Sequence, residues 1–139
     1  MAGEVKISWS DTALRLLATD PAVLAGMDRV TAQLVSEMKR RCPVSPVYSG
    51  HESGHLRSSV RAFRQGNDSV IIGPTADYAK FVVEGTRPHI IRAHGDYSLH
   101  NRATGRYFGR VVHHPGTAPN PFVTEAAQEI AARNAGRRV

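Results

Sequence analysis

One short motif in the sequence could do chemistry: the run His51-Glu52-Ser53-Gly54-His55 matches the zinc-hydrolase pattern H-E-x-x-H. On a helix, the two histidines would lie one turn apart and bind zinc, while the glutamate would activate the bound water. Here, however, serine and glycine occupy the middle of the motif, prolines lie upstream, and no apolar helix face flanks it. We therefore interpret the run as a loop with two incidental histidines, and we rank a zinc hydrolase last of three hypotheses.

Cys42 is the only cysteine in the chain, which excludes an internal disulfide and fits a reducing compartment. The basic residues that precede it favour a lowered thiol pKa, but no convincing base accompanies it, so a plain thiol is the simpler interpretation. The sequence also lacks the nucleophile-elbow, P-loop and dinucleotide-binding patterns. We predict that the protein is not an enzyme and that it holds neither a metal nor another cofactor.

The formal net charge of +6 favours a polyanionic partner. Three arginines, Arg57, Arg61 and Arg64, are spread along one segment and are the candidates for facing DNA. Few aromatic residues lie between the basic side chains, so the sequence does not predict a compact base-stacking platform. A monomeric basic DNA-binding module, whose affinity would fall steeply with salt, is therefore the second hypothesis.

The length of 139 residues is that of one domain, so we expect residues 1–139 to form a single domain with one modest core. No apolar run approaches the roughly 20 residues that cross a bilayer, and no membrane partner is expected. Residues 1–9 carry charges but no apolar core of a secretory signal. Synthesis in the cytoplasm is the simplest inference.

A long amphipathic helix is the most strongly predicted element. Asp20-Pro21 is a helix start, with an N-cap acid followed by proline at the first helical position. Apolar residues then recur at helical spacing from Val23 to Met38, and Glu37 is expected on the polar face. The helix is predicted to end near Arg41, where basic residues suit the helix dipole. A shorter helical piece is expected over residues 10–19.

A second helix is predicted near the C-terminus, starting at Asn120-Pro121. Its apolar stripe consists of Phe122, Ala126 and Ile130, while its glutamates lie outside that stripe. The residues after this helix, about 134–139, are polar and basic and are expected to fray.

Alternating residues predict a short strand over 4–9, before the long helix, and, between the two helices, an antiparallel hairpin made of 58–65 and 69–73. The next segment, Ala76–Thr86, is predicted to be a short helix with Thr75 as its N-cap. Its apolar stripe would consist of Tyr78, Phe81 and Val82, and Gly85 would end it in a left-handed conformation.

Residues 87–114 form a long polar excursion with strand-like pieces at 89–93 and 107–113. A structureless loop of this length is unusual inside a compact domain, so we predict a β-hairpin arm with a flexible tip at about 94–105. The arm has too few apolar residues for a core of its own and therefore needs a partner. Its candidate intersubunit contacts are Ile90, Ile91, Tyr107, Phe108 and Val111.

The order of these features resembles the neck and tail-completion proteins of long-tailed bacteriophages, a family of head–tail joining and tail-component proteins. Four blocks carry the resemblance: a proline-rich loop that leads through Ser53-Gly54 to Val60, the block Tyr78–Thr86, His114-Pro115-Gly116, and Pro121-Phe122-Val123. The first loop is longer than is usual in the family, and a valine replaces an aromatic residue or shifts the second block by one position.

The resemblance implies an α+β subunit with the N-terminal and C-terminal helices packed on a small, mainly antiparallel sheet. It also implies a structural virion protein that assembles into a ring, of six subunits in the family, between the head connector and the tail tube. The partners would be other copies, connector or head-completion proteins, tail-tube or tail-terminator proteins, and DNA that passes through the channel without sequence-specific contacts. A tail-terminator ring is the alternative within this first hypothesis.

Under the resemblance, several residues would be architectural. Tyr78, Glu84, Gly85 and Thr86 belong to the second block, where Gly85 ends the helix. Pro115-Gly116 would turn the chain, and Pro121-Phe122 would start and anchor the last helix. The protein would be located in the neck or tail of the virion, after assembly in the cytoplasm of the bacterial host.

Overall fold

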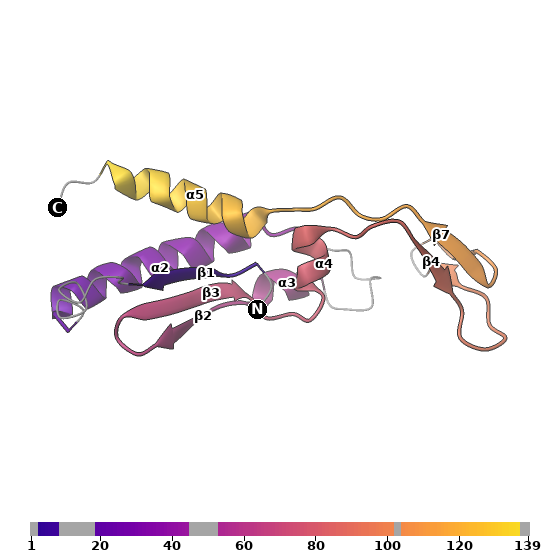
Figure 1. Cartoon of the computed structure of the whole chain (residues 1–139), viewed down its shortest axis with the longest axis horizontal. Coiled ribbons are helices and arrows are strands. Elements are labelled where there is room, and N and C mark those ends of the chain that lie inside the picture. The colour runs from indigo at the N-terminus through magenta and orange to yellow at the C-terminus, as the bar shows by residue number, and fades with distance from the viewer. Residues whose placement is uncertain (1–2, 9–18, 45–52, 102–103, 137–139) are drawn as a thin grey trace.

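The structure is a computed structural model, which describes residues 3–8, 19–44, 53–101 and 104–136. Figure 1 shows two parts: a core of helices and a sheet, and a long two-stranded arm that points away from it. The core combines helices with an antiparallel sheet, so the predicted α+β class is confirmed. Except for Thr19, the predicted helical piece at 10–19 lies outside the described residues. The first two residues of the H-E-x-x-H run, His51 and Glu52, also lie outside them.

Helix α2, Pro21–Arg41, begins and ends as predicted. The Asp20 carboxylate accepts hydrogen bonds from the backbone N–H groups of Ala22 (2.7 Å) and Val23 (3.4 Å), which are otherwise unpaired at a helix start. At the other end, the Cys42 N–H donates to the carbonyl of Met38 at 2.8 Å. The buried apolar residues of this helix are Met27, Leu34 and Met38. In the part of the chain that the structure describes, no helix is both long and apolar enough to cross a membrane.

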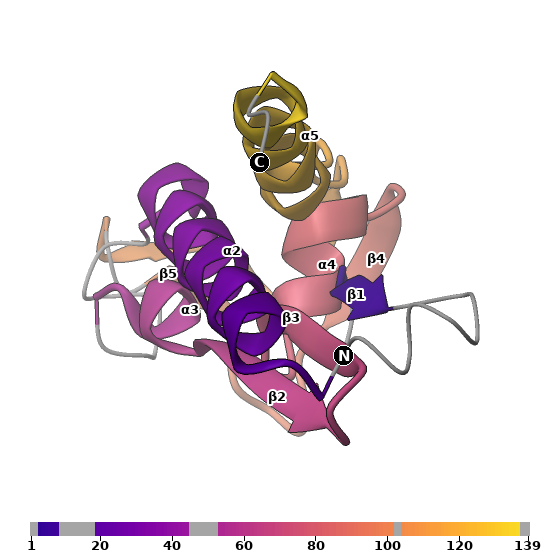
Figure 2. The ribbon, with the colours of Figure 1, turned by 90° about the vertical axis from the view of Figure 1, so that its left-hand side faces the viewer.

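Three antiparallel strands form the sheet of the core in the order β1-β3-β2. They are β1, Val5–Ser8; β2, Val60–Gln65; and β3, Ser69–Pro74. Residues Val5, Ile72 and Ala62 are paired across the three strands and share one face of the sheet, and α2 packs on β2 and β3. Figure 2 shows α2 and helix α5, Phe122–Ala135, on the same side of β2 and β3. The predicted hairpin is confirmed, with its turn at residues 66–68.

Helix α5 contributes the largest fully buried side chain of the described residues. Phe122 is fully buried, and Ala126 and Ile130 one and two turns later are buried with it, as the apolar stripe predicted. The helix runs to Ala135, so the first residues of the tail that was expected to fray are helical. The Asn134 side chain explains this extension, because its amide donates to Gln33 Oε1 on α2 at 3.1 Å.

Two short helices complete the core: α3, His55–Ser58, and α4, Ala79–Glu84. Helix α4 starts three residues later than predicted, because Thr75 is not its N-cap. The Thr75 hydroxyl instead donates to the backbone carbonyl of Ser59 at 3.0 Å and joins the end of β3 to the start of β2.

The predicted apolar stripe of α4 is also wrong in one respect. Ala79 is the side chain that this helix buries, whereas Phe81 is 57% exposed and Val82 is half-buried. Tyr78 lies just before the helix and is half-buried. A large aromatic side chain is therefore presented to solvent where the sequence predicted a contact with the core.

Glu37 is a second correction, because this predicted surface residue is only 4% exposed. Its carboxylate accepts hydrogen bonds from Arg40 at 2.5 Å and from Arg41 at 2.7 Å, and it lies 3.6 Å from the Arg133 guanidinium of α5. The hydrogen bonds from Arg40 and Arg41 lower the pKa of Glu37 to about 2. Burial of this charge is tolerated because guanidinium groups surround it, and the cluster ties α2 to α5.

Candidate intersubunit interface

The arm, defined as residues 87–114, leaves the core through a narrow base. Thr86 and Thr117 form an isolated antiparallel bridge in which each backbone N–H donates to the carbonyl of the other at 3.0 Å. The Thr117 N–H also approaches the Thr86 hydroxyl oxygen at 3.0 Å. One step further into the core, the Asn120 N–H donates to the Val82 carbonyl at the end of α4. These bonds fix the point from which the arm projects.

Two glycines allow the chain segments to meet at this base. Gly85 has a φ of 72° and Gly116 a φ of 89°, a region that side chains with a Cβ rarely adopt. A Cβ on Gly85 would overlap the carbonyl oxygen of Thr117, and a Cβ on Gly116 would overlap that of Thr86. The turn at Pro115-Gly116 therefore needs glycine for two independent reasons, its backbone conformation and the closeness of the opposite strand.

The arm itself is a hairpin in two sections. The inner section pairs β4, His89–Arg92, with β7, Val111–His114, and the outer section pairs β5, His100–Asn101, with β6, Arg106–Tyr107. Between them, the Ala93 N–H donates to the Arg110 carbonyl at 2.8 Å. The predicted hairpin is thus present, but Tyr107 lies in a separate strand from Val111, and β5 lies within the segment predicted to be a flexible tip.

Apolar side chains of the arm are presented to solvent. Six of the nine exposed large hydrophobic residues in the described chain lie in the arm, namely Ile90, Ile91, Tyr97, Tyr107, Phe108 and Val111. None of the buried apolar residues of the core lies there. Because exposed apolar side chains concentrated on one element are typical of an interaction surface, the arm is the candidate interface of this protein.

Some of these side chains are held in place by neighbours within the arm. The Tyr107 ring stacks on His100 with centroids 4.5 Å apart, and the Arg106 guanidinium lies 5.2 Å from the centre of the Phe108 ring. Nearer the base, the rings of His89 and His114 are 4.9 Å apart. Aromatic groups that are already oriented lose little conformational entropy when they bind. Tyr97, which is 82% exposed, was not singled out from the sequence because it lies in the polar tip.

The arginines proposed to face DNA are in different surroundings. Arg57 lies in α3, whereas Arg61 and Arg64 lie on β2 at positions of opposite parity and therefore on opposite faces of the sheet. Arg64 forms an ion pair with Asp28 of α2. The structure thus does not bring the three guanidinium groups together on one surface.

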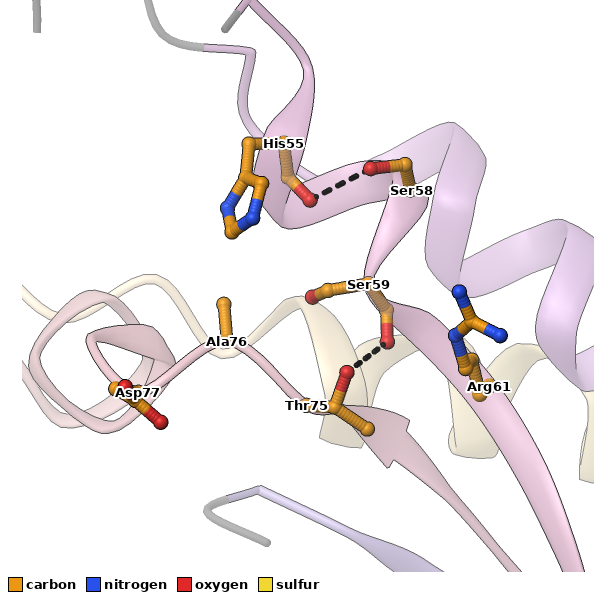
Figure 3. A pocket seen from close by; sticks show the side chains of 7 residues that line it. All are labelled: His55, Ser58, Ser59, Arg61, Thr75, Ala76 and Asp77. Carbon is orange, nitrogen blue, oxygen red and sulfur yellow. Dashed lines mark hydrogen bonds between the residues drawn. The ribbon is translucent and has the colours of Figure 1, made fainter. Parts of the chain in front are cut away.

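A polar hollow lies where β2 begins and β3 ends, and Figure 3 shows its lining. The Ser58 hydroxyl donates to the backbone carbonyl of His55 at 2.9 Å, and the Thr75 hydroxyl donates to that of Ser59. The ring of His55 is 3.1 Å from the Tyr78 hydroxyl. These hydroxyl protons are used in backbone bonds, so the hollow joins chain segments and does not present a serine activated by histidine.

The zinc-like motif is described in the structure only from Ser53 to His55. Gly54 has a φ of 78° and precedes the start of α3 at His55. The helix that carries His55 therefore does not extend back through Gly54, and His51 and Glu52 lie outside the described residues. Within the described ranges, no group of three or more histidine, cysteine or acidic side chains is placed to hold a metal ion.

Cys42 corrects another expectation from the sequence. Its side chain is 3% exposed, and burial raises the pKa of the thiol to about 11 despite the nearby Arg57. The thiol is therefore not activated, because desolvation of the thiolate outweighs the attraction of Arg57, in agreement with the simpler interpretation of a plain thiol.

The structure thus combines a small α+β core with a projecting arm that exposes six large apolar side chains. Residues 18–85 match the family described as Bacteriophage HK97-gp10, putative tail-component. This segment runs through α2, the β2–β3 hairpin and α4, and it ends where the arm begins. No curated protein and no solved structure matches the chain significantly. Residues 18–85 are therefore similar to phage tail components, in agreement with the resemblance in the sequence.

Proposed function

We propose that this protein is a structural subunit of the neck or tail of a long-tailed bacteriophage, and that its copies assemble through the arm into a ring at the head–tail junction. The observation that carries the proposal is the arm, where six exposed large apolar side chains stand on an element without a buried core. Such an element gains stability only when a partner covers it. The match to phage tail components supplies the setting.

In this setting, the ring would join a connector or head-completion protein to the tail tube, and a tail-terminator ring is the alternative position. A count of six subunits is taken from the resemblance. Assembly would take place in the host cytoplasm, and the mature location would be the virion. Under this proposal the work of the protein is architectural, and no residue has a catalytic role.

The proposal is tested by shortening the arm at a point that the structure defines. Ala93 and Arg110 are hydrogen-bonded across the hairpin, so residues 94–109 can be replaced by Asn-Gly, a two-residue turn that suits a β-hairpin. This arm-shortened variant keeps β4, β7 and the base. We expect light scattering and electron microscopy to show ring-shaped oligomers of the 15.1 kDa chain for the wild type and monomers for the variant. A wild-type protein that stays monomeric at all concentrations would overturn the proposal.

Passage of DNA through the ring supplies a second, smaller expectation. The net charge of +6 should give weak binding to duplex DNA of any sequence, and this binding should fall steeply with salt. Replacing Arg57 and Arg61 with glutamine should weaken it about equally for unrelated sequences, which fluorescence anisotropy can measure. Binding that distinguishes one sequence from another would instead favour a dedicated DNA-binding module.

A further inference from the structure

The positive charge of this protein is concentrated in the arm. Residues 87–114 contain five arginines, no lysine and a single acidic residue, Asp96, so their formal charge is +4 out of +6 for the whole chain. The rest of the chain contributes only +2, although it holds most of the residues. We infer that the arm, and not the set Arg57, Arg61 and Arg64, is the element that binds duplex DNA, through the phosphates.

This inference rests on one part of the proposed function, the passage of DNA, and names the element that contacts the DNA. It does not depend on the ring, because an arm can bind phosphates whether or not its neighbours are in place. The two ideas can therefore fail separately.

The charge of the arm is largely left without acidic partners. Asp96 lies 3.6 Å from the guanidinium of Arg110, which also donates to the Gly95 carbonyl at 2.7 Å. In the part of the chain that the structure describes, Arg92 and Arg106 are exposed and form no ion pair. An exposed guanidinium group can donate two parallel hydrogen bonds to one phosphate, so these two arginines are suited to a DNA backbone.

Several arginines of the core are, by contrast, already paired with Asp28 or Glu37. The arginines in this group are Arg40, Arg41, Arg64 and Arg133. Because an adjacent carboxylate offsets much of the field of a guanidinium group, these side chains add little to the attraction of a polyanion. The arm therefore attracts DNA more strongly than the core surface does.

The shape of the arm fits a groove of duplex DNA. It is a ribbon of two strands without a covering layer: every residue of β4, β5 and β6 is exposed, and β7 alternates between exposed and half-buried residues. Paired strands lie about 4.8 Å apart, and a major groove about 12 Å wide admits a two-stranded ribbon. Figure 1 shows that the arm extends well beyond the core, so the core does not obstruct this approach.

The tip can contact DNA and a neighbouring subunit at the same time. Arg106 and Tyr107 are successive residues of β6, so their side chains lie on opposite faces of the ribbon. Arg106 lies over the Phe108 ring on one face, and Tyr107 stacks on His100 on the other. A neighbour that covers the Tyr107 face leaves the guanidinium of Arg106 accessible to phosphate.

A pair of double variants tests the inference. Arg92→Gln/Arg106→Gln removes two charges from the arm, and the matched control Arg57→Gln/Arg61→Gln removes two exposed charges from the core. Fluorescence anisotropy with duplex DNA over a salt series gives the slope of log affinity against log salt concentration. Each lost phosphate contact should reduce this slope by about 0.9, so we expect a loss of about two in the arm variant and of less than about one in the core variant.

Two further measurements separate charge from assembly. Arg92→Lys/Arg106→Lys keeps both charges and should keep the wild-type slope. Light scattering in the same buffers identifies conditions in which all proteins have the same oligomeric state, and the slopes are compared there, because a ring would bind DNA through several arms at once.

An equal or larger loss of slope in the core variant would overturn the inference. Tighter binding to single-stranded than to duplex DNA of the same length would also overturn it, since the tip would then act by base stacking. If the arm variant fails to assemble but binds DNA like the wild type, its arginines serve a protein contact and the inference is wrong. A wild type that forms rings without binding DNA would overturn this inference alone, whereas a monomer that binds DNA through the arm would overturn only the ring.

Discussion

The core and the arm of this protein are stabilised in different ways. In the core, α2, α5 and the sheet bury apolar side chains around Phe122, which is fully buried. In the arm, the strands are held by backbone hydrogen bonds, ring contacts and glycines at special conformations, while the large apolar residues face solvent. Since the burial of apolar surface is the main driving force of folding, we expect the core to fold without the arm. Under the proposed function, the arm would rely on the core below it and on a partner beyond it.

If the proposed function holds, this difference separates the residues that fold the protein from those that assemble it. A substitution in the core should change stability, and one at the arm tip should change association. A substitution at the base of the arm, where Thr86 meets Thr117, should change both stability and association, because the base fixes how the arm is oriented on the core. Each of the following experiments challenges that separation.

The largest effect is expected from a pair of phenylalanines. Phe122→Ala leaves a cavity at the centre of the core and should lower the free energy of unfolding by about 3–5 kcal/mol. Phe108→Ala, at a side chain that is 42% exposed, should lower it by less than about 1 kcal/mol, since it removes mainly a contact with Arg106. Urea unfolding followed by circular dichroism at low protein concentration measures both.

Equal destabilisation by the two substitutions would contradict the separation and would make the arm part of the folding unit. A second unfolding transition in the wild type, absent from the arm-shortened variant, would mean that the arm folds as a unit of its own. That residues 1–139 form a single domain stays a prediction that the same unfolding curves address.

Much of the core could be predicted because its signals are local. Asp20-Pro21 marks a helix start through groups within three residues, and the stripe Phe122, Ala126 and Ile130 follows from helical spacing. The burial of Glu37 could not be predicted in the same way. Its exposure depends on Arg133, almost one hundred residues later, which lies beside it only because α5 packs on α2.

The candidate interface was predicted in part. Composition indicated an arm without a core, and the residues that would contact a partner were identified by their apolar character. Helical periodicity placed Phe81 in the core, because a short helix gives no information on which side the rest of the protein lies. Thr75 was misassigned as a cap for a similar reason: its hydroxyl bonds Ser59 across the sheet, a contact that spacing along the chain does not show.

A smaller effect is expected at the base of the arm. Gly116→Ala should destabilise the base by about 2–3 kcal/mol, because alanine is strained at a φ of 89° and its Cβ would overlap the Thr86 carbonyl. Gly109→Ala is the matched control, since Gly109 has a φ of 78° but no atom within 4 Å of the added Cβ. It should cost only the backbone strain of about 1–2 kcal/mol.

Hydrogen exchange reports this effect at the right place. The amides of Thr86 and Thr117 donate to each other's carbonyls, so their protection should fall in Gly116→Ala while that of the core strands is kept. Unchanged protection of these two amides would mean that the close approach of the strands at the base does not hold the arm. Loss of protection in β2 and β3 as well would mean that the base and the core open together.

The smallest effect concerns acid sensitivity, which we expect to belong to the core. Arg40 and Arg41 lower the pKa of Glu37 from 4.5 to about 2, so between these values the unfolded chain binds more protons than the native one. The stabilisation by Glu37 is therefore complete above about pH 4.5 and is lost as the pH falls toward 2. Glu37→Gln should flatten this part of the stability profile, as urea titrations between pH 2 and 6 would measure.

Glu125→Gln provides the control for this experiment, because Glu125 is half exposed and meets Arg41 only at 3.4 Å. It should leave the loss of stability between pH 4.5 and 2 nearly unchanged, since exposed ion pairs contribute little to the free energy of unfolding. The arm-shortened variant should lose stability at low pH as the wild type does, because the arginines paired with Glu37 come from α2 and α5. If shortening the arm changes the loss of stability at low pH and Glu37→Gln does not, the acid-sensitive contacts lie outside the core. The two regions would then share a source of stability that their separate architectures do not predict.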